Sequence, residues 1–151
     1  MPGASIWTAI VSNVTVAAIK EAFMLNPAQI AKSGTEQAEQ TALFAWAALP
    51  EIRKVHPELE WMFAIPNGGT RDKIEAGRLK AAGVRAGVWD IFLPAARRSF
   101  HGAFIEMKVG KNSTSDKQDD FRRYFQWAGY FGIVCYSWED AAREISLYLS
   151  S

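Results

Sequence analysis

The chain contains one cysteine and two histidines among 151 residues. With Cys135 as the single thiol, an internal disulfide and a zinc site built on cysteines are both excluded. The two histidines, His56 and His101, stand 45 residues apart and have no partner at metal-ligand spacing. We therefore expect both histidines to have structural or incidental roles.

The chain also lacks a surplus of charge of either sign. Seventeen basic and sixteen acidic residues give a net charge of +1. The chain therefore lacks the overall basic excess that would indicate a nucleic-acid binder. Evidence for such binding has to come from local clusters. Hydrophobic residues make up 49% and charged residues 22%, which is typical of one globular domain with a real core.

No long uninterrupted apolar run is present. The most apolar stretch, Ile6 to Ile19, contains Ser12, Asn13 and Thr15 and has no basic residue before it. This composition disfavours a signal peptide or a membrane span. We expect the protein to lie in the cytoplasm of a bacterium, either as a bacterial protein or as a phage protein made in its host.

Periodicity and turn residues predict a mixed order of helices and strands. Residues 5–25 favour a helix, although their β-branched content also fits a strand. Ser33 or Thr35 is expected to cap the next helix, and Ser115 a later one. The order fits one α/β domain with a central mixed sheet. The expected helices are 5–25, 35–49, 71–82, 116–129 and 137–149, and the expected strands are 60–65, 87–93, 102–109 and 131–136.

Three charged residues interrupt two otherwise apolar strands. Asp90 lies within Gly87–Leu93, and Glu106 and Lys108 lie within Gly102–Val109. Side chains alternate along a strand, so Glu106 and Lys108 share one face. Such charges are costly to bury unless they pair or hold a metal.

These residues suit metal-assisted phosphodiester hydrolysis. A hard cation such as Mg²⁺ prefers oxygen ligands, which Asp90, Glu106 and the Met107 backbone carbonyl can supply. Lys108 can orient or deprotonate a water, or neutralise charge that grows on a phosphate. An ordinary ion pair between Glu106 and Lys108, with Asp90 at a strand end, fits the same pattern.

Two helices carry further polar candidates. Gln118 shares a helix face with Phe121 and Phe125, so it can reach the same site, and a surface glutamine fits equally well. Near the start of the earlier helix, Glu36 and Glu39 are rival acids. Stabilisation of the helix N-terminus by a negative charge is an alternative explanation for each of these two acids.

Five ordered blocks extend this pattern over most of the chain, from Thr35 to Leu149. Together they resemble the VRR-NUC family of the PD-(D/E)XK nuclease superfamily. The blocks are Thr35-Glu36-x-x-x-Gln40, Ile65–Arg71, Gly77–Asp90, Phe104–Lys108 and Ser115-x-x-Gln118.

The resemblance implies a restriction-endonuclease-like fold, with a mixed four-stranded sheet flanked by helices. It also implies that Asp90 and Glu106 bind Mg²⁺ or Mn²⁺ and that Lys108 is the catalytic lysine. Gln118 and Glu36 match the polar residues of the two helices. The family usually has proline before the aspartate, whereas this chain has Trp89, which puts the local strand geometry in question.

The function implied is a metal-dependent, structure-specific endodeoxyribonuclease. Similar stand-alone enzymes act as homodimers on branched DNA, including four-way junctions. Alternatives are a nuclease for flaps or nicked duplex, or a DNA-binding subunit without turnover of its own. We expect residues 35–151 to form the nuclease domain, and residues 1–34, with apolar Trp7 and Phe23, to form a helical dimerisation segment. Packing of residues 1–34 within one subunit fits the same apolar pattern equally well.

Local basic clusters supply candidate phosphate contacts although the whole chain is nearly neutral. Solvated helix and loop faces would have the same composition. The candidates are Arg71, Lys73, Arg78, Lys80, Arg85 and Lys111.

Overall fold

The computed structural model describes residues 26–66 and 73–151. The expected helix at 5–25 and the candidate Arg71 lie outside these ranges. One sheet has the strand order β1-β2-β3-β4. Its first three strands are antiparallel and β3 is parallel to β4, which confirms the predicted mixed sheet. The strands are β1 Phe63–Ala64, β2 Ile91–Leu93, β3 Ala103–Met107 and β4 Phe131–Cys135.

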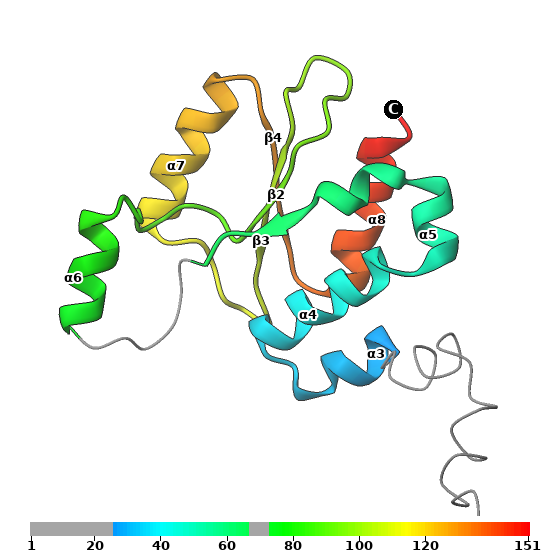
Figure 1. Cartoon of the computed structure of the whole chain (residues 1–151), viewed down its shortest axis with the longest axis horizontal. Coiled ribbons are helices and arrows are strands. Elements are labelled where there is room, and N and C mark those ends of the chain that lie inside the picture. The colour runs from blue at the N-terminus through cyan, green and yellow to red at the C-terminus, as the bar shows by residue number, and fades with distance from the viewer. Residues whose placement is uncertain (1–25, 67–72) are drawn as a thin grey trace, which may run out of the picture.

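Side-chain caps begin the helices that build the site. Thr35, Ser115 and Ser137 each accept a hydrogen bond from a backbone N–H in the first turn of the helix that follows. Thr35, rather than Ser33, is therefore the cap of α4. The helices are α3 Pro27–Ile30, α4 Glu36–Ala47, α5 Pro50–Val55, α6 Lys73–Ala81, α7 Asp116–Trp127 and α8 Trp138–Leu149 (Figure 1).

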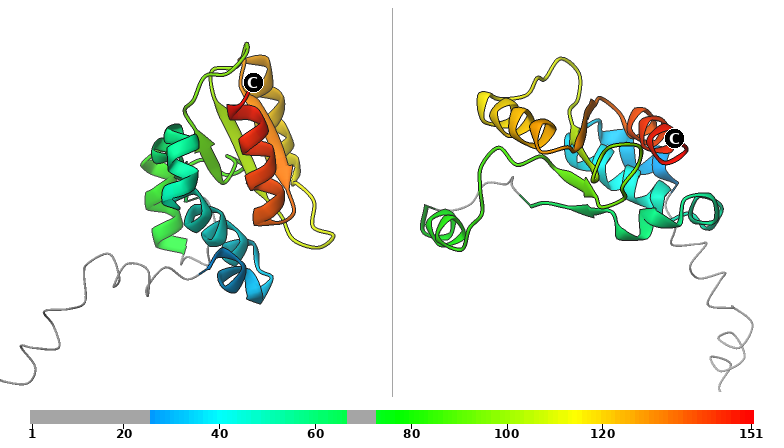
Figure 2. Two further views of the ribbon diagram at one scale, coloured as in Figure 1. Left: turned by 90° about the vertical axis from the view of Figure 1, so that its right-hand side faces the viewer. Right: turned by 90° about the horizontal axis from the view of Figure 1, so that it is seen from above.

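Helices cover both faces of the sheet. α4 and α8 pack together on one face and α7 lies on the other (Figures 1 and 2). Side chains of strand β3 alternate between the two layers of helices. Ile105 and Met107 join the core beneath α4 and α8. Phe104 points the other way and packs against Phe121 and Phe125 of α7. This alternation puts Glu106 on the α7 face of the sheet.

The remaining short elements surround this core. α3 packs against α4, so residues 27–30 of the segment assigned to 1–34 contact the domain that follows. α6 stands apart from the sheet in Figure 1 and in the right-hand view of Figure 2. Within the described ranges, every helix is too short or too polar to cross a lipid bilayer.

All four strands are shorter than the sequence predicts, β1 and β2 most of all. Residues 57–61 form a 3₁₀ turn that begins at a proline, which leaves only Phe63–Ala64 in β1. β2 begins at Ile91 rather than near Gly87, because Gly87 has a φ of +89° and cannot extend a strand. Asp90 therefore lies just before β2 and not inside it.

Gly132 in β4 is required by close packing between the sheet and α7. A Cβ atom there would lie 2.4 Å from the Phe125 ring. Gly132→Ala is expected to lower the free energy of unfolding by about 1–3 kcal/mol, because the ring and α7 must shift. Gly77→Ala is the control, since its Cβ meets nothing within 4 Å and alanine favours the helix. Urea denaturation measures both variants, and equal stabilities would contradict the packing.

Candidate functional site

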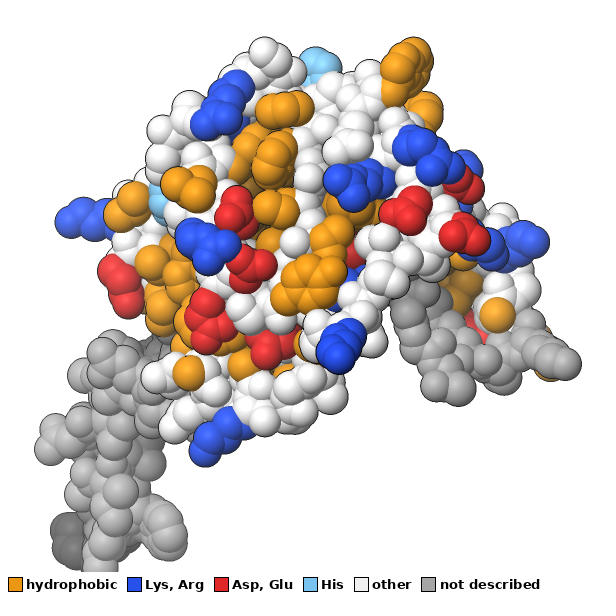
Figure 3. Space-filling model, turned by 180° about the vertical axis from the view of Figure 1, so that it is seen from behind, with side chains coloured by type: hydrophobic (Ala, Val, Ile, Leu, Met, Phe, Trp, Pro, Cys, Tyr) orange, Lys and Arg blue, Asp and Glu red, His pale blue; other side chains and the backbone are white. Residues whose placement is uncertain are grey.

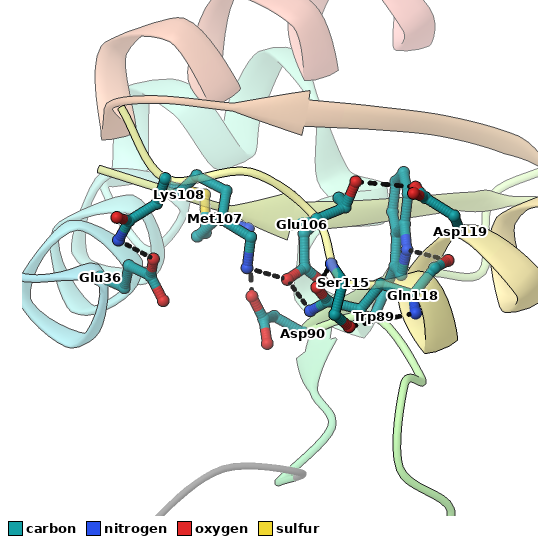
Figure 4. A network of polar contacts seen from close by, with 11 residues as sticks. Glu36, Trp89, Asp90, Glu106, Met107, Lys108, Ser115, Gln118 and Asp119 are labelled. Atoms are coloured by element: carbon teal, nitrogen blue, oxygen red, sulfur yellow. Dashed lines mark hydrogen bonds and ion pairs between the residues drawn. The ribbon is translucent and has the colours of Figure 1, made fainter. Parts of the chain in front are cut away.

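One pocket of about 310 Å³ brings together the five side chains that the sequence singles out. They come from two helices and two strand ends: Glu36 begins α4 and Gln118 lies in the first turn of α7 (Figure 4). Glu106 lies in β3, Lys108 directly follows β3, and Asp90 directly precedes β2. The residues lining the pocket are Glu36, Ala86, Gly87, Val88, Asp90, Glu106, Lys108, Ser115, Lys117 and Gln118.

Glu106 is the centre of this arrangement. Its side chain is fully buried, and its Oε1 atom accepts a hydrogen bond from Lys108 Nζ at 2.5 Å. Gln118 Nε2 donates to the same oxygen. The other oxygen, Oε2, is also buried and has no hydrogen-bond partner among the described residues. A buried carboxylate oxygen without a partner is costly, so this atom is suited to a cation.

Gln118 has two functions in its helix. Its Oε1 atom accepts from the Ser115 backbone N–H at 2.9 Å and completes a capping box with the Ser115 hydroxyl. Its Nε2 atom holds Glu106. The cap therefore fixes the Gln118 side chain in the position that orients Glu106.

Asp90 is held against β3 by the backbone. Its Oδ2 atom accepts from the Met107 N–H at 3.1 Å, and its carbonyl accepts from the Ile65 N–H at 2.7 Å. These bonds hold Asp90 between β1 and β3, one residue before β2 begins. The carboxyl of Asp90 thus lies beside Glu106 without being part of a strand.

Trp89 secures the Asp90 segment to α7. The indole is fully buried, donates from Nε1 to the Gln118 carbonyl at 3.1 Å, and packs edge-on against Phe125. Trp89 therefore links the segment that carries Asp90 to the helix that carries Gln118.

Gly87 is a second positioning residue that the sequence did not single out. A Cβ atom at this position would lie 2.6 Å from the Lys117 carbonyl oxygen, and φ is +89°. Only glycine permits this approach of the loop to the start of α7. A glycine at the start of an otherwise apolar segment is the signal that could have identified it.

Burial dominates the electrostatics of the two acids. It raises the pKa of Glu106 to about 7, against the hydrogen bond from Lys108, and the nearby Asp90 charge raises it further. Burial also raises the pKa of Asp90, although the Met107 N–H and Lys108 oppose it. Without a cation, the pair thus resists full ionisation at neutral pH.

Lys108 keeps its proton. Burial lowers its pKa, but the hydrogen bond and charge of Glu106, together with Glu36 and Asp90, more than offset this and leave the pKa above the ordinary value. The ammonium is buried beside Glu106 at the end of β3. It therefore brings a fixed positive charge to the pocket.

The residues present fit a divalent cation that prefers oxygen. Asp90 and Glu106 supply two carboxylates, and one Glu106 oxygen lacks any partner among the described residues. The described ranges contain no group of three or more His, Cys, Asp or Glu side chains at metal-binding distances. A cation here would need backbone oxygen and water as further ligands, which Mg²⁺ accepts.

The two rival acids of α4 have different surroundings. Glu36 lines the pocket, and its Oε1 atom accepts from Asn112 Nδ2 at 3.0 Å. Glu39 Oε2 accepts from the Trp138 backbone N–H at 2.8 Å, at the start of α8. Glu39 therefore caps a different helix, and the acid of α4 that faces the pocket is Glu36.

The candidate phosphate contacts are more dispersed. Arg78, Lys80, Arg85 and Lys111 are exposed, whereas Lys73 is placed only by its backbone at the start of α6. Arg85 directly precedes Ala86, which lines the pocket. Figure 3 shows basic and acidic side chains interspersed on the face turned away in Figure 1, in keeping with the net charge of +1.

The Glu106 carboxyl predicts a measurable dependence of stability on pH. Between about pH 4.5 and about 7 the folded chain holds this proton more often than the unfolded chain. In metal-free buffer the wild-type protein should therefore lose stability relative to Glu106→Gln as pH rises through this window. Thermal unfolding with a chelator tests this, with Glu51→Gln on α5 as control. A difference that stays constant across the window would contradict the shift.

The similarity of this chain to known proteins lies in its three-dimensional structure. No protein-family model matches the sequence, and a search of curated proteins finds no significant match. A solved structure described as a VRR_NUC domain protein matches with a TM-score of 0.65 and 26% identity, over 77% of this chain and 88% of that chain. The likeness indicates a nuclease. The likeness supports a VRR-NUC domain in this chain, and the mixed sheet with flanking helices fits the PD-(D/E)XK nuclease fold.

Proposed function

We propose that the protein is a metal-dependent DNA endonuclease that hydrolyses phosphodiester bonds at branched DNA. The observation that carries this proposal is the buried Glu106 Oε2, which has no partner among the described residues and lies in one pocket with Asp90 and Lys108. A salt bridge alone explains only Oε1. The unsatisfied oxygen and the neighbouring acid are accounted for by a bound cation.

Asp90, Glu106 and the Met107 carbonyl would hold Mg²⁺ or Mn²⁺. When bound, such an ion polarises a phosphate oxygen and lowers the pKa of a water. Gln118 keeps Glu106 oriented through its bond to Oε1. These residues would therefore form the hydrolytic centre, with the helix cap at Ser115 fixing its geometry.

Lys108 would stabilise charge on the phosphate. Its pKa is raised by Glu106, so it is protonated at neutral pH and is better suited to this role than to that of a base. Glu36 faces the same pocket from α4, and its charge raises the pKa of both Asp90 and Lys108. We propose that Glu36 completes the catalytic set by orienting water.

The proposed substrate is a four-way junction, cut by a homodimer. A two-fold dimer presents two equivalent sites, which suits two symmetric cuts. Residues 1–34 are proposed to form the contact between subunits, with 35–151 as the nuclease domain. Phosphate contacts are proposed for Arg71, Lys73, Arg78, Lys80, Arg85 and Lys111.

Substitutions in the pocket are expected to remove cleavage. Asp90→Ala, Glu106→Ala and Lys108→Ala should each lower the rate on a junction substrate by roughly 100- to 1,000-fold, because each removes a ligand or a stabilising charge. Omission of Mg²⁺ should have the same effect. Gel assays compare junction, flap, nicked and plain duplex, with Glu51→Ala and Lys54→Ala on α5 as charge-matched controls.

Three outcomes separate the alternatives. Full activity of the Asp90 or Lys108 variant would exclude the mechanism. Equal cleavage of every DNA shape would exclude the preference for junctions. Tight binding with no cleavage in Mg²⁺ or Mn²⁺ would favour a DNA-binding subunit instead.

The oligomeric state tests the role of the N-terminal segment. The full chain at micromolar concentration is expected to sediment at twice its mass of 16.8 kDa. Replacement of the apolar Trp7 and Phe23 by glutamate should shift it to a monomer, since charge at an apolar interface opposes association. A monomeric wild-type protein in analytical ultracentrifugation would contradict the dimer.

A further inference from the structure

The outer side of α7 exposes two large aromatic rings next to each other. Tyr124 is 63% exposed and Trp127 is 83% exposed, and their ring centroids are 6.0 Å apart with 40° between the planes. Core packing does not require them, because Phe121 and Phe125 of the same helix pack against Phe104. Exposed, adjacent aromatic side chains suggest a binding surface.

A second pocket connects the Tyr124 ring to the candidate catalytic pocket. Its volume is about 650 Å³, and it shares Ala86 and Lys117 with the first pocket. A strand bound in one pocket can therefore continue into the other. The second pocket is lined by Arg85, Ala86, Lys117, Asp120, Phe121 and Tyr124.

The charges of this second pocket favour an anion. Arg85 and Lys117 are exposed, and neither forms an ion pair within the described ranges. The one acid in the lining, Asp120, is already paired with Arg123. Two available cations and a neutralised acid suit a phosphate backbone.

Helical spacing places the basic and aromatic residues in one line. Lys117, Tyr124 and Trp127 stand at i, i+7 and i+10, so they share one stripe of α7. Ten residues of helix span about 15 Å. That length corresponds to about four nucleotides at a stacked spacing of about 3.4 Å.

We propose that this stripe binds an unpaired DNA segment that continues from the cleavage site, with bases stacked on Tyr124 and Trp127 and phosphates at Arg85 and Lys117. Unpaired bases expose faces that can stack on aromatic rings, whereas bases in a duplex are already stacked. The inference rests on the proposed nuclease function and narrows its substrate. The preferred DNA would carry unpaired bases beside the cut, at an opened branch point or in a flap.

Binding measurements without cleavage test this surface. Fluorescence anisotropy in a chelator compares a labelled oligothymidylate, a blunt duplex and the same duplex with a single-stranded tail. Tyr124→Ala/Trp127→Ala should weaken binding of the oligothymidylate and the tailed duplex by roughly 10- to 100-fold, as expected for lost stacking. The affinity ratio of tailed to blunt duplex should fall accordingly.

Two control variants separate the loss of base stacking from other consequences of replacing an aromatic residue. Tyr124→Phe keeps the ring and should bind the oligothymidylate like the wild type. Trp61→Ala removes a Trp that is 69% exposed but lies outside both pockets, and it should leave all three affinities unchanged. Circular dichroism verifies that each variant is folded.

The outcomes also distinguish this inference from the proposed function. The inference fails if the wild type does not bind oligothymidylate, if the double variant retains its affinity, or if blunt and tailed duplex weaken equally. Cleavage of a junction by the wild type in Mg²⁺ reports on the proposed function separately. If the protein stacks unpaired bases but does not cleave a junction, the binding surface is supported and the nuclease function is contradicted.

Discussion

The burial of a carboxylate within a β-strand is the constraint around which this molecule is organised. Glu106 cannot be solvated, so its neighbours must supply what water would supply. Lys108 and Gln118 satisfy Oε1, while Oε2 remains without a partner in the described part of the chain. Burial of the carboxyl, together with the nearby Asp90 charge, raises the Glu106 pKa to about 7. A cation would satisfy Oε2 and keep the carboxylate ionised.

Helix α7 connects this constraint to the fold and to the surface. Its first turn holds Glu106 through the capping-box residue Gln118, and its inner face packs Phe125 against the sheet. Trp89 bonds to the same turn and thereby links Asp90 to the helix. Tyr124 on the outer side remains available to bind a ligand. A shift of this one helix would change the catalytic geometry and the proposed strand path together.

Sequence periodicity predicted the longer helices, the four strands and the shared face of Glu106 and Lys108, because periodicity is a local property. It missed the short helices α3 and α5. The order of the elements predicted a mixed sheet, and the resemblance to VRR-NUC proteins predicted its four strands. Other features depend on contacts between distant segments. Gly87 is needed because a loop approaches the carbonyl of Lys117, and Glu39 is set apart by a bond to α8. The bond from Glu39 to α8 leaves no mark in the local pattern, so the sequence could not separate Glu36 from Glu39.

The central claim is that a divalent cation binds at the Glu106 carboxylate. The most direct measurement is the anomalous X-ray signal of Mn²⁺ in crystals of the wild-type protein. The account predicts one peak within coordination distance of Glu106 Oε2 and the Asp90 carboxylate, and no such peak in Glu106→Gln crystals. A wild-type map without manganese in this pocket at saturating concentration, with Oε2 still lacking a partner, would contradict it.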